Sequence, residues 1–433
     1  MYVTHHSAAA AAIAAAEYPK NNGSTVPVEP QDSVLLSLVE SCDWAATLAR
    51  IASHPMETCV IGLAGRPPLH MACENDAPAV VIQSLLAVYP EASLHTGVST
   101  LNPLHITCSS QHASVHVVRV LVEGGHSRQC TMRDEDGDTP LHTACRCGAP
   151  LEVLEILLKI CPTVCYERDY EGLTPIQRLW VRYFVTLGTD VIDSVKGPAD
   201  LHGELGDAWN KTELLLSAAH GGALSTTNNS NHGNGNGSTF RAVHAAAAVD
   251  CPRAVVKIAA SVYPRQLDEK DENGMTPVMI AAQSPIFKDR DLSDDGYALD
   301  DVVYGQEEQV QGEHGIDGWP SDPSTENKGP QASVIEILLE ANRESASAAA
   351  CVPDPMGRLP LHWALATGKH LDQGVKPLIE VHPEALVVPD VETKLFPFML
   401  AAQADNDMDT IYHVLRLNPA TIGDLREGKK GNQ

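Results

Sequence analysis

Apolar residues recur at helical spacing in short segments along the chain, and most of these segments end directly before a proline. Five of them are Val80–Tyr89, Val153–Cys161, Val255–Tyr263, Lys376–His382 and Ile411–Asn418, each followed at once by proline. Proline lacks the amide hydrogen and clashes with the preceding helical turn, so it ends a helix. The pattern therefore predicts a series of short helices, each with an apolar face.

A second recurring string precedes these segments. In its fullest copy it runs from Asp134 through Gly137 and Thr139 to Pro140 and His142. Asp and Gly favour a tight turn, because Asp can bond backbone amides and Gly tolerates positive φ. Thr can cap a helix, and Pro fits its first turn, where no amide hydrogen is needed. We expect a turn and then a first helix, with the His able to bond the neighbouring turn backbone.

The string occurs eight times, with its proline (alanine in the fifth copy) at positions 68, 103, 140, 175, 242, 277, 360 and 397. Successive gaps are 35, 37, 35, 67, 35, 83 and 37 residues, so the two long gaps fit one period plus an insertion. A unit of two short helices cannot bury its apolar face alone. Stacking on neighbouring units is therefore expected.

These strings resemble the ankyrin-repeat family across roughly Pro67 to Ile422. Pro-Leu-His stands at four places and Asp-x-x-Gly-x-Thr-Pro at three, and the spacing is close to the family period of about 33 residues. The second helices depart from the family, ending in Tyr, His, Cys or Asn before Pro instead of the common Gly-Ala. The resemblance implies an all-α, ankyrin-type helical repeat solenoid with short projecting hairpins and a concave protein-binding face. Two long insertions interrupt it here.

The pattern also predicts a division of the chain. The chain begins with a disordered or frayed tail at 1–31 and a degenerate capping repeat at 32–64. Repeats 1–4 follow at 65–187, with the second helix of repeat 4 near 210–220, inside an insertion at 188–238 that carries an Asn/Gly-rich loop. Repeats 5 and 6 lie at 239–284, an acidic disordered insertion at 285–330, the second helix of repeat 6 with repeats 7 and 8 at 331–425, and a polar tail at 426–433. A ninth, degenerate repeat is the alternative for 207–220. The acidic insertion is expected to be an idle solvated loop; the alternative is a docking segment for a basic partner, anchored by Trp319 and Tyr304.

Net charge narrows the range of partners. The formal charge is -26, and an acidic surface repels phosphate backbones and anionic headgroups. We therefore expect no nucleic acid as a partner. We also expect no membrane insertion, because no apolar run reaches the roughly 18 residues of a membrane span. The odd total of 11 cysteines forms no tight framework, which favours reduced thiols in the cytoplasm or nucleus.

The candidate chemical groups are better explained as parts of the repeat. Cys73, Cys108 and Cys145 occupy one position in three consecutive units. Stacked helices lie about 8–10 Å apart, beyond the roughly 7 Å that a disulfide spans, so we expect separate buried thiols. His142 with neighbouring cysteines could suggest zinc, but no Cys-x2-Cys pair occurs. Histidine recurs at one repeat position, which favours a structural role. We expect no enzyme, no cofactor and no metal.

In ankyrin proteins, contacts usually come from hairpin tips and the exposed starts of first helices. Carried over by position, the expected partner-binding residues are Glu135, Asp136, Asp138, Arg146, Tyr170, Glu171, Glu272, Asn273, Met275, Met356 and Arg358. The preferred anchors are Tyr170, Met275, Met356 and Arg358, because aromatic, Met and Arg residues are enriched in interface cores. The leading hypothesis is a non-catalytic scaffold or adaptor for a protein with a basic or mixed-charge surface. The alternative is a substrate-recognition or regulatory subunit of a larger enzyme complex, such as a ubiquitin ligase.

Overall fold

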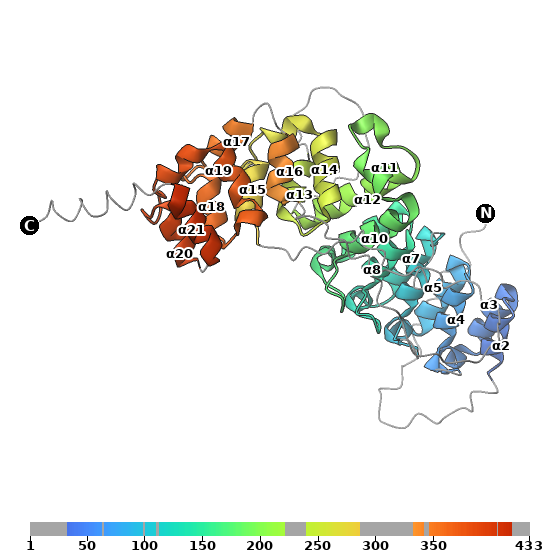
Figure 1. Ribbon diagram of the computed structural model, residues 1–433. Helices are drawn as coiled ribbons and strands as arrows, with labels where there is room; N and C mark the ends of the chain where they lie inside the picture. The colour runs from blue at the N-terminus through green and yellow to red at the C-terminus, as the bar shows by residue number, and fades with distance from the viewer. Residues whose placement is uncertain are drawn as a thin grey trace, which may run out of the picture. The chain divides into compact units, whose positions relative to one another are not determined.

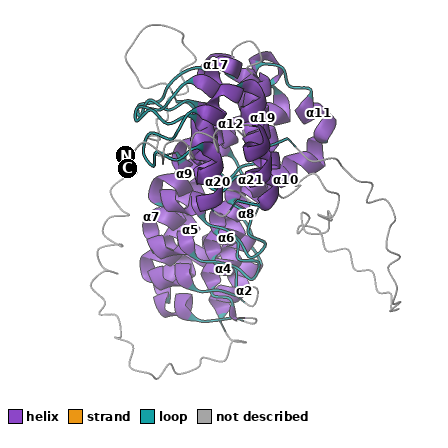
Figure 2. Cartoon of the chain, turned by 60° about the vertical axis from the view of Figure 1, so that its left-hand side comes forward, coloured by secondary structure: helices purple, strands orange, loops and turns teal. Residues whose placement is uncertain are grey.

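The computed structural model describes residues 33–62, 65–97, 100–109, 112–220, 240–285, 332–341, 346–404 and 406–417. It divides into two compact units, Met1–Arg182 and Tyr183–Gln433. The described residues form helices and connecting turns, and no strand occurs among them (Figures 1 and 2). The predicted tails at 1–31 and 426–433, the Asn/Gly-rich loop and the acidic insertion beyond Pro285 lie outside the described residues.

The first helix of each predicted repeat begins at one of the eight positions that the sequence pattern indicated. These helices are α4 (Pro68–Glu74), α6 (Pro103–Cys108), α8 (Pro140–Cys147), α10 (Pro175–Leu187), α13 (Ala242–Ala248), α15 (Pro277–Gln283), α18 (Pro360–Ala366) and α20 (Pro397–Gln403). Proline is favoured at this place because its fixed φ suits a first helical turn. Before α6, the Asn102 side chain also accepts a hydrogen bond from the His105 backbone N–H at 2.9 Å.

A second helix follows in most repeats. These are α5 (Ala79–Val88), α7 (Val115–Gly124), α9 (Leu151–Ile160), α14 (Arg253–Val262), α16 (Val334–Ala341), α19 (Val375–Val381) and α21 (Met408–Leu417). In the first unit α6 packs between α4 and α8, while α7 packs between α5 and α9. The leucine after the anchor proline is buried in the first three repeats, where Leu69, Leu104 and Leu141 are at most 1% exposed. Burying each such side chain stabilises the stack by about 1.5–3 kcal/mol.

One helix pair extends the stack toward the N-terminus. Helix α2 (Val34–Glu40) packs on α4, and α3 (Trp44–Ser53) packs on α5. The Asp43 side chain caps α3 by accepting a hydrogen bond from the Ala46 N–H at 3.0 Å. The segment predicted as a degenerate capping repeat thus contains two helices packed on the first repeat.

Most second helices, and α3, are followed by a short 3-10 helix, which the sequence pattern did not predict. These are η2 (Pro55–Cys59), η4 (Pro90–Leu94), η5 (Ser127–Thr131), η6 (Pro162–Tyr166), η8 (Pro264–Leu267) and η11 (Pro383–Val387). The residue before the proline leaves the helical region, as Tyr89 does with φ -137° and ψ 79°, because proline restricts its predecessor. In five of the six cases the proline then begins the 3-10 helix, whereas η5 begins at Ser127. This added element accounts for units longer than the family period.

Among its described residues, the second unit has three further α-helices, besides the short 3-10 helices η7 (Pro198–Asp200) and η10 (Leu371–Gln373). The three α-helices are α11 (Thr189–Asp193), α12 (Gly203–Ala219) and α17 (Ala346–Cys351). Helix α12 covers the segment predicted to be a helix near 210–220, and it packs on α13. Its Glu213 accepts hydrogen bonds from the Trp209 indole at 3.0 Å and from the Tyr263 hydroxyl at the end of α14. No helix among the described residues is both long enough and apolar enough to cross a membrane.

Candidate protein-binding surface

In five of the eight repeats, the turn before the first helix is built around an aspartate. In the third repeat the Asp134 carboxylate accepts hydrogen bonds from the N–H groups of Asp136 at 3.1 Å and Asp138 at 2.8 Å. The Asp134 N–H donates to the Asp138 carbonyl at 3.0 Å, which closes the turn. Gly137 has φ +80°, a conformation that glycine adopts without steric cost. The predicted Asp-x-x-Gly turn therefore has a direct structural cause.

Successive turns pack against each other through their glycines. A Cβ atom on Gly137 would lie 2.7 Å from the Tyr170 ring, and one on Gly274 would lie 2.7 Å from Pro355. A Cβ on Gly357 would lie 3.2 Å from Val391. In each case the covering residue directly follows the aspartate of the next described turn. The absence of a side chain at the glycine thus lets one turn rest on the next.

The repeated histidines link neighbouring repeats. Each ring Nε2 lies near a carbonyl of the following turn: His70 with Leu101 at 3.2 Å, His105 with Asp138 at 3.0 Å, His142 with Leu173 at 3.2 Å, His244 with Glu269 at 3.0 Å and His362 with Val388 at 2.9 Å. The Thr139 N–H donates to Nδ1 of His142 at 3.2 Å, so Nε2 carries the proton and donates to the carbonyl. The predicted structural role of these histidines is confirmed.

Burial controls the protonation of these histidines. It lowers the pKa of His70, His105 and His142 to about 4, because a charged imidazolium is poorly solvated inside the stack. In the fourth repeat, Gln177 stands at the position that histidine occupies in five other repeats. Its Oε1 accepts hydrogen bonds from the Thr174 N–H at 2.9 Å and from the Thr174 hydroxyl at 3.1 Å. The glutamine oxygen thus takes the place of the histidine Nδ1 as hydrogen-bond acceptor, and the glutamine side chain does not titrate.

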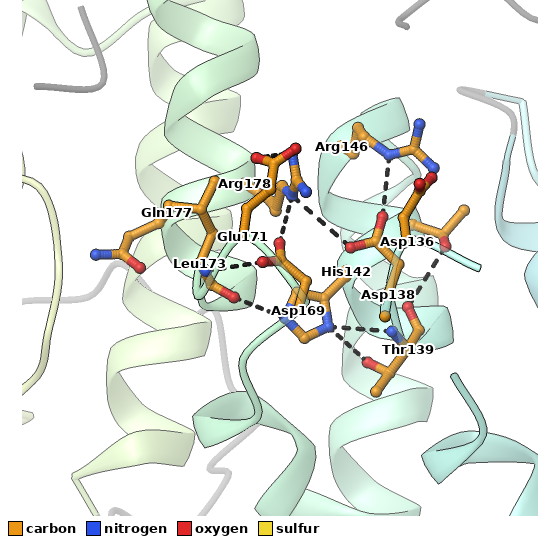
Figure 3. Close-up of polar contacts among 12 residues, drawn as sticks. Asp136, Asp138, Thr139, His142, Arg146, Asp169, Glu171, Leu173, Gln177 and Arg178 are labelled. Carbon is orange, nitrogen blue, oxygen red and sulfur yellow. Dashed lines mark hydrogen bonds and ion pairs between the residues drawn. The ribbon is translucent and has the colours of Figure 1, made fainter. Parts of the chain in front are cut away.

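A buried ion-pair cluster joins the third and fourth turns (Figure 3). Asp138 lies between the guanidinium groups of Arg146, at 3.2 Å, and Arg178, at 3.7 Å. Arg178 also pairs with Asp169 at 2.6 Å and with Glu171 at 3.3 Å. Burial raises the pKa of Asp138 to about 6, and the two arginines oppose that rise. The cluster therefore fixes one turn against the next at the edge of the first unit.

The second unit has a related arrangement around Arg358. Its guanidinium pairs with Asp390 at 2.7 Å and with Glu392 at 2.8 Å. It also lies 4.0 Å from the centroid of the Trp363 ring, whose indole N–H donates to Asp354 at 2.9 Å. An arginine is thus held between an aromatic face and carboxylates of the next turn.

The structure separates the expected partner-binding residues into three groups by their exposure to solvent. Seven are exposed: Glu135, Asp136, Tyr170, Glu171, Glu272, Asn273 and Met356. Arg146 and Met275 are half-buried. Asp138 and Arg358, which we expected at exposed tips, are only 1% and 5% exposed.

These two residues are buried because their position, two before the anchor proline, faces the next repeat. Leu173 at the same position is fully buried. A charged residue placed there needs partners, which the sequence reasoning missed: Arg178 for Asp138, and Asp390 for Arg358. The only available signal was a charged residue at a position that other copies fill with an apolar one.

The repeated cysteines are buried in the first helices. Cys73, Cys108 and Cys145 are at most 6% exposed, which confirms their predicted burial. Burial raises the pKa of Cys73 to about 12 and that of Cys108 well above its usual range. Among the residues that the structure describes, no group of three or more His, Cys, Asp or Glu side chains is placed to hold a metal ion.

Comparison with known proteins agrees with this architecture. Residues 69–164 match the family model for ankyrin repeats in three copies, a range that runs from α4 to η6. A comparison with curated proteins gave no match. Ankyrin repeats generally mediate protein–protein interaction, and proteins built from them are typically non-catalytic. With the family turn, the linking histidines and the paired helices, these three consecutive repeats identify residues 69–164 of this chain as ankyrin repeats.

Proposed function

We propose that this chain is a non-catalytic scaffold or adaptor that binds a partner protein through its turn tips and the exposed starts of its first helices. The observation that carries the proposal is the presence of large side chains at the tips that remain open to solvent. Tyr170 is 72% exposed and Met356 is 75% exposed, although aromatic residues and methionine are enriched in the cores of protein interfaces. The recurring histidines and cysteines, in contrast, are used within the stack.

The proposal includes a partner with a basic or mixed-charge surface. Four of the exposed tip residues, Glu135, Asp136, Glu171 and Glu272, are acidic, and the whole chain carries -26. Such a surface disfavours nucleic acid and anionic membranes. We retain the domain division that the sequence predicted and a cytoplasmic or nuclear location, which the use of cysteines as small buried residues supports.

Quantitative affinity purification tests the proposal. The full chain is compared with a double variant, Tyr170→Ala and Met356→Ala, which changes two exposed tips. The matched control is Val80→Ala on α5, where a 51% exposed side chain lies away from the turns. We expect the tip variant to lose co-purifying proteins by at least about fivefold, roughly 1 kcal/mol, while the control retains them.

Equal recovery with the tip variant and the control would show that the tips do not bind the partner. Arg358→Glu is unsuitable here, because this buried arginine is paired within the stack and its loss would disturb folding. An enzyme that co-purifies with the wild type and is lost with the tip variant would favour the role of a recognition subunit in a larger enzyme complex.

A further inference from the structure

The chain itself shows how its turns can hold an arginine. Arg358 lies 4.0 Å from the centroid of the Trp363 ring, and its guanidinium pairs with Asp390 and Glu392 of the next turn at 2.7 and 2.8 Å. An aromatic face attracts a cation through its negative quadrupole. The carboxylates bond the edge of the guanidinium while the ring covers its face. The ring belongs to helix α18, and the two carboxylates belong to the turn that follows in the next repeat.

The turn of the fourth repeat presents an aromatic ring that is open to solvent. Tyr170 is 72% exposed, yet it is held in place by the preceding turn. Its backbone N–H donates to the Asp136 carbonyl at 3.0 Å, and its ring packs so closely over Gly137 that a Cβ there would lie 2.7 Å away. A ring fixed in this way loses little conformational freedom when a ligand covers it.

Three acidic residues lie next to Tyr170 in the sequence or in the preceding turn. Glu135 and Asp136 are exposed in the preceding turn, and the Glu171 side chain is 52% exposed directly after Tyr170.

The arginines of the same turns are engaged with backbone carbonyls. Arg133 donates to the Gly137 carbonyl at 2.9 Å and pairs with Glu167. Arg168 donates to the Gly172 carbonyl at 2.7 Å. Arg178 on α10 pairs with Glu171 at 3.3 Å, but the Glu171 side chain stays 52% exposed. The exposed tip therefore combines an aromatic face with the carboxylates of Glu135 and Asp136 and with Glu171, which already has one partner in the stack.

We propose that Tyr170, with the carboxylates of Glu135, Asp136 and Glu171, binds an arginine side chain that a partner protein presents. This inference rests on the proposed function and names the chemistry of the partner at one tip. Arginine fits better than lysine, because a planar, weakly hydrated guanidinium stacks on an aromatic face while its edge bonds carboxylates. A lysine ammonium is compact and strongly hydrated, so it gains less from the ring.

The test uses a phage-displayed library of random twelve-residue peptides selected on the full chain. Enriched peptides are synthesised, and their affinities are measured by fluorescence anisotropy for the wild type, Tyr170→Ala and Tyr170→Phe. Tyr412→Ala, which removes a 64% exposed tyrosine elsewhere, is the matched control. We expect the enriched peptides to share an arginine. We expect Tyr170→Ala to weaken binding about two- to fivefold, as for an exposed cation–π contact, while Tyr170→Phe and Tyr412→Ala stay close to the wild type.

Changing the shared arginine of the peptide to lysine should also weaken binding. Enriched peptides without arginine, or equal affinity for Tyr170→Ala and Tyr412→Ala, would overturn the inference. If such peptides still lost affinity when Met356 was changed to alanine, the proposed function would stand and only the arginine site would fall. A library that yields no binder at all would count against both.

Discussion

Mild acid should destabilise the repeat stack through its buried histidines. Burial holds the pKa of His70, His105 and His142 at about 4, whereas an unfolded histidine titrates near 6.5. The neutral ring is therefore favoured in the folded state, and its contribution is fully present above about pH 6.5. It is lost as the pH falls from there toward 4. Linkage gives a loss of about 2 kcal/mol for each histidine between pH 7 and pH 5, or about 6 kcal/mol for the three.

Asp138 changes in the opposite sense. Its pKa is raised to about 6, so the folded state favours the protonated carboxyl. Acidification from pH 7 to pH 5 then raises the free energy of unfolding by about 1 kcal/mol through Asp138. This gain is too small to offset the loss from the histidines. The net expectation is a loss of several kcal/mol, comparable with the total stability of a typical domain.

Urea unfolding of the full chain at pH 7 and pH 5, followed by helical circular dichroism, measures this loss. The informative variant is His142→Gln, because Gln177 already fills the corresponding position in the next repeat. The substitution costs stability at both pH values, since the bond to the Leu173 carbonyl is lost. However, the difference between pH 7 and pH 5 should shrink by about 2 kcal/mol. His116→Gln, at an exposed position of α7, is the control. If His142→Gln kept the full wild-type difference, the reasoning would be refuted.

Two further substitutions test how the turns are held. Gly137→Ala should lower stability by more than about 1–2 kcal/mol, because alanine is strained at φ +80° and its Cβ would meet the ring packed above it. Gly65→Ala is the control in thermal melting, because Gly65 has φ +72° and open space around it. Equal losses of stability in the Gly137 and Gly65 variants would show that contact with the Tyr170 ring does not matter. Asp390→Asn should cost about 3–5 kcal/mol, because it breaks a buried ion pair and leaves Arg358 only its exposed partner. Glu392→Gln, at a 68% exposed side chain, should cost less than about 1 kcal/mol, and the reverse order in urea unfolding would contradict the assignment.

The sequence predicted the first helices well because their signals are local. Proline at the first helical position, as in Pro140, and a glycine with positive φ, as in Gly137, depend on a few neighbouring bonds. The 3-10 helices were missed because the same proline that ends a helix can also begin a tighter turn. Pro90 shows both roles at once. Such a proline therefore both ends the second helix and begins the 3-10 helix that follows it.

The candidate surface was harder to predict because exposure depends on the neighbouring repeat. Position alone placed Asp138, Tyr170 and Arg358 at turn tips, yet only Tyr170 is open to solvent. The other two face the following turn and depend on charged partners supplied by another repeat. No periodicity within one repeat encodes such a partner, which lies more than thirty residues away along the chain in the case of Arg358.

The exposure and packing of the turn residues show where binding specificity can reside in this chain. Residues that recur at one position, such as the linking histidines, are constrained by the stack and cannot distinguish one partner from another. His142 and Gln177 differ chemically but occupy the same structural role. The residue after each turn aspartate is freer, because it needs only to cover the preceding glycine. Tyr170, Pro355 and Val391 all do so with different chemistry. Variation at this position changes the exposed surface without changing the turn beneath it, so partner recognition can diverge there while the repeat stays intact.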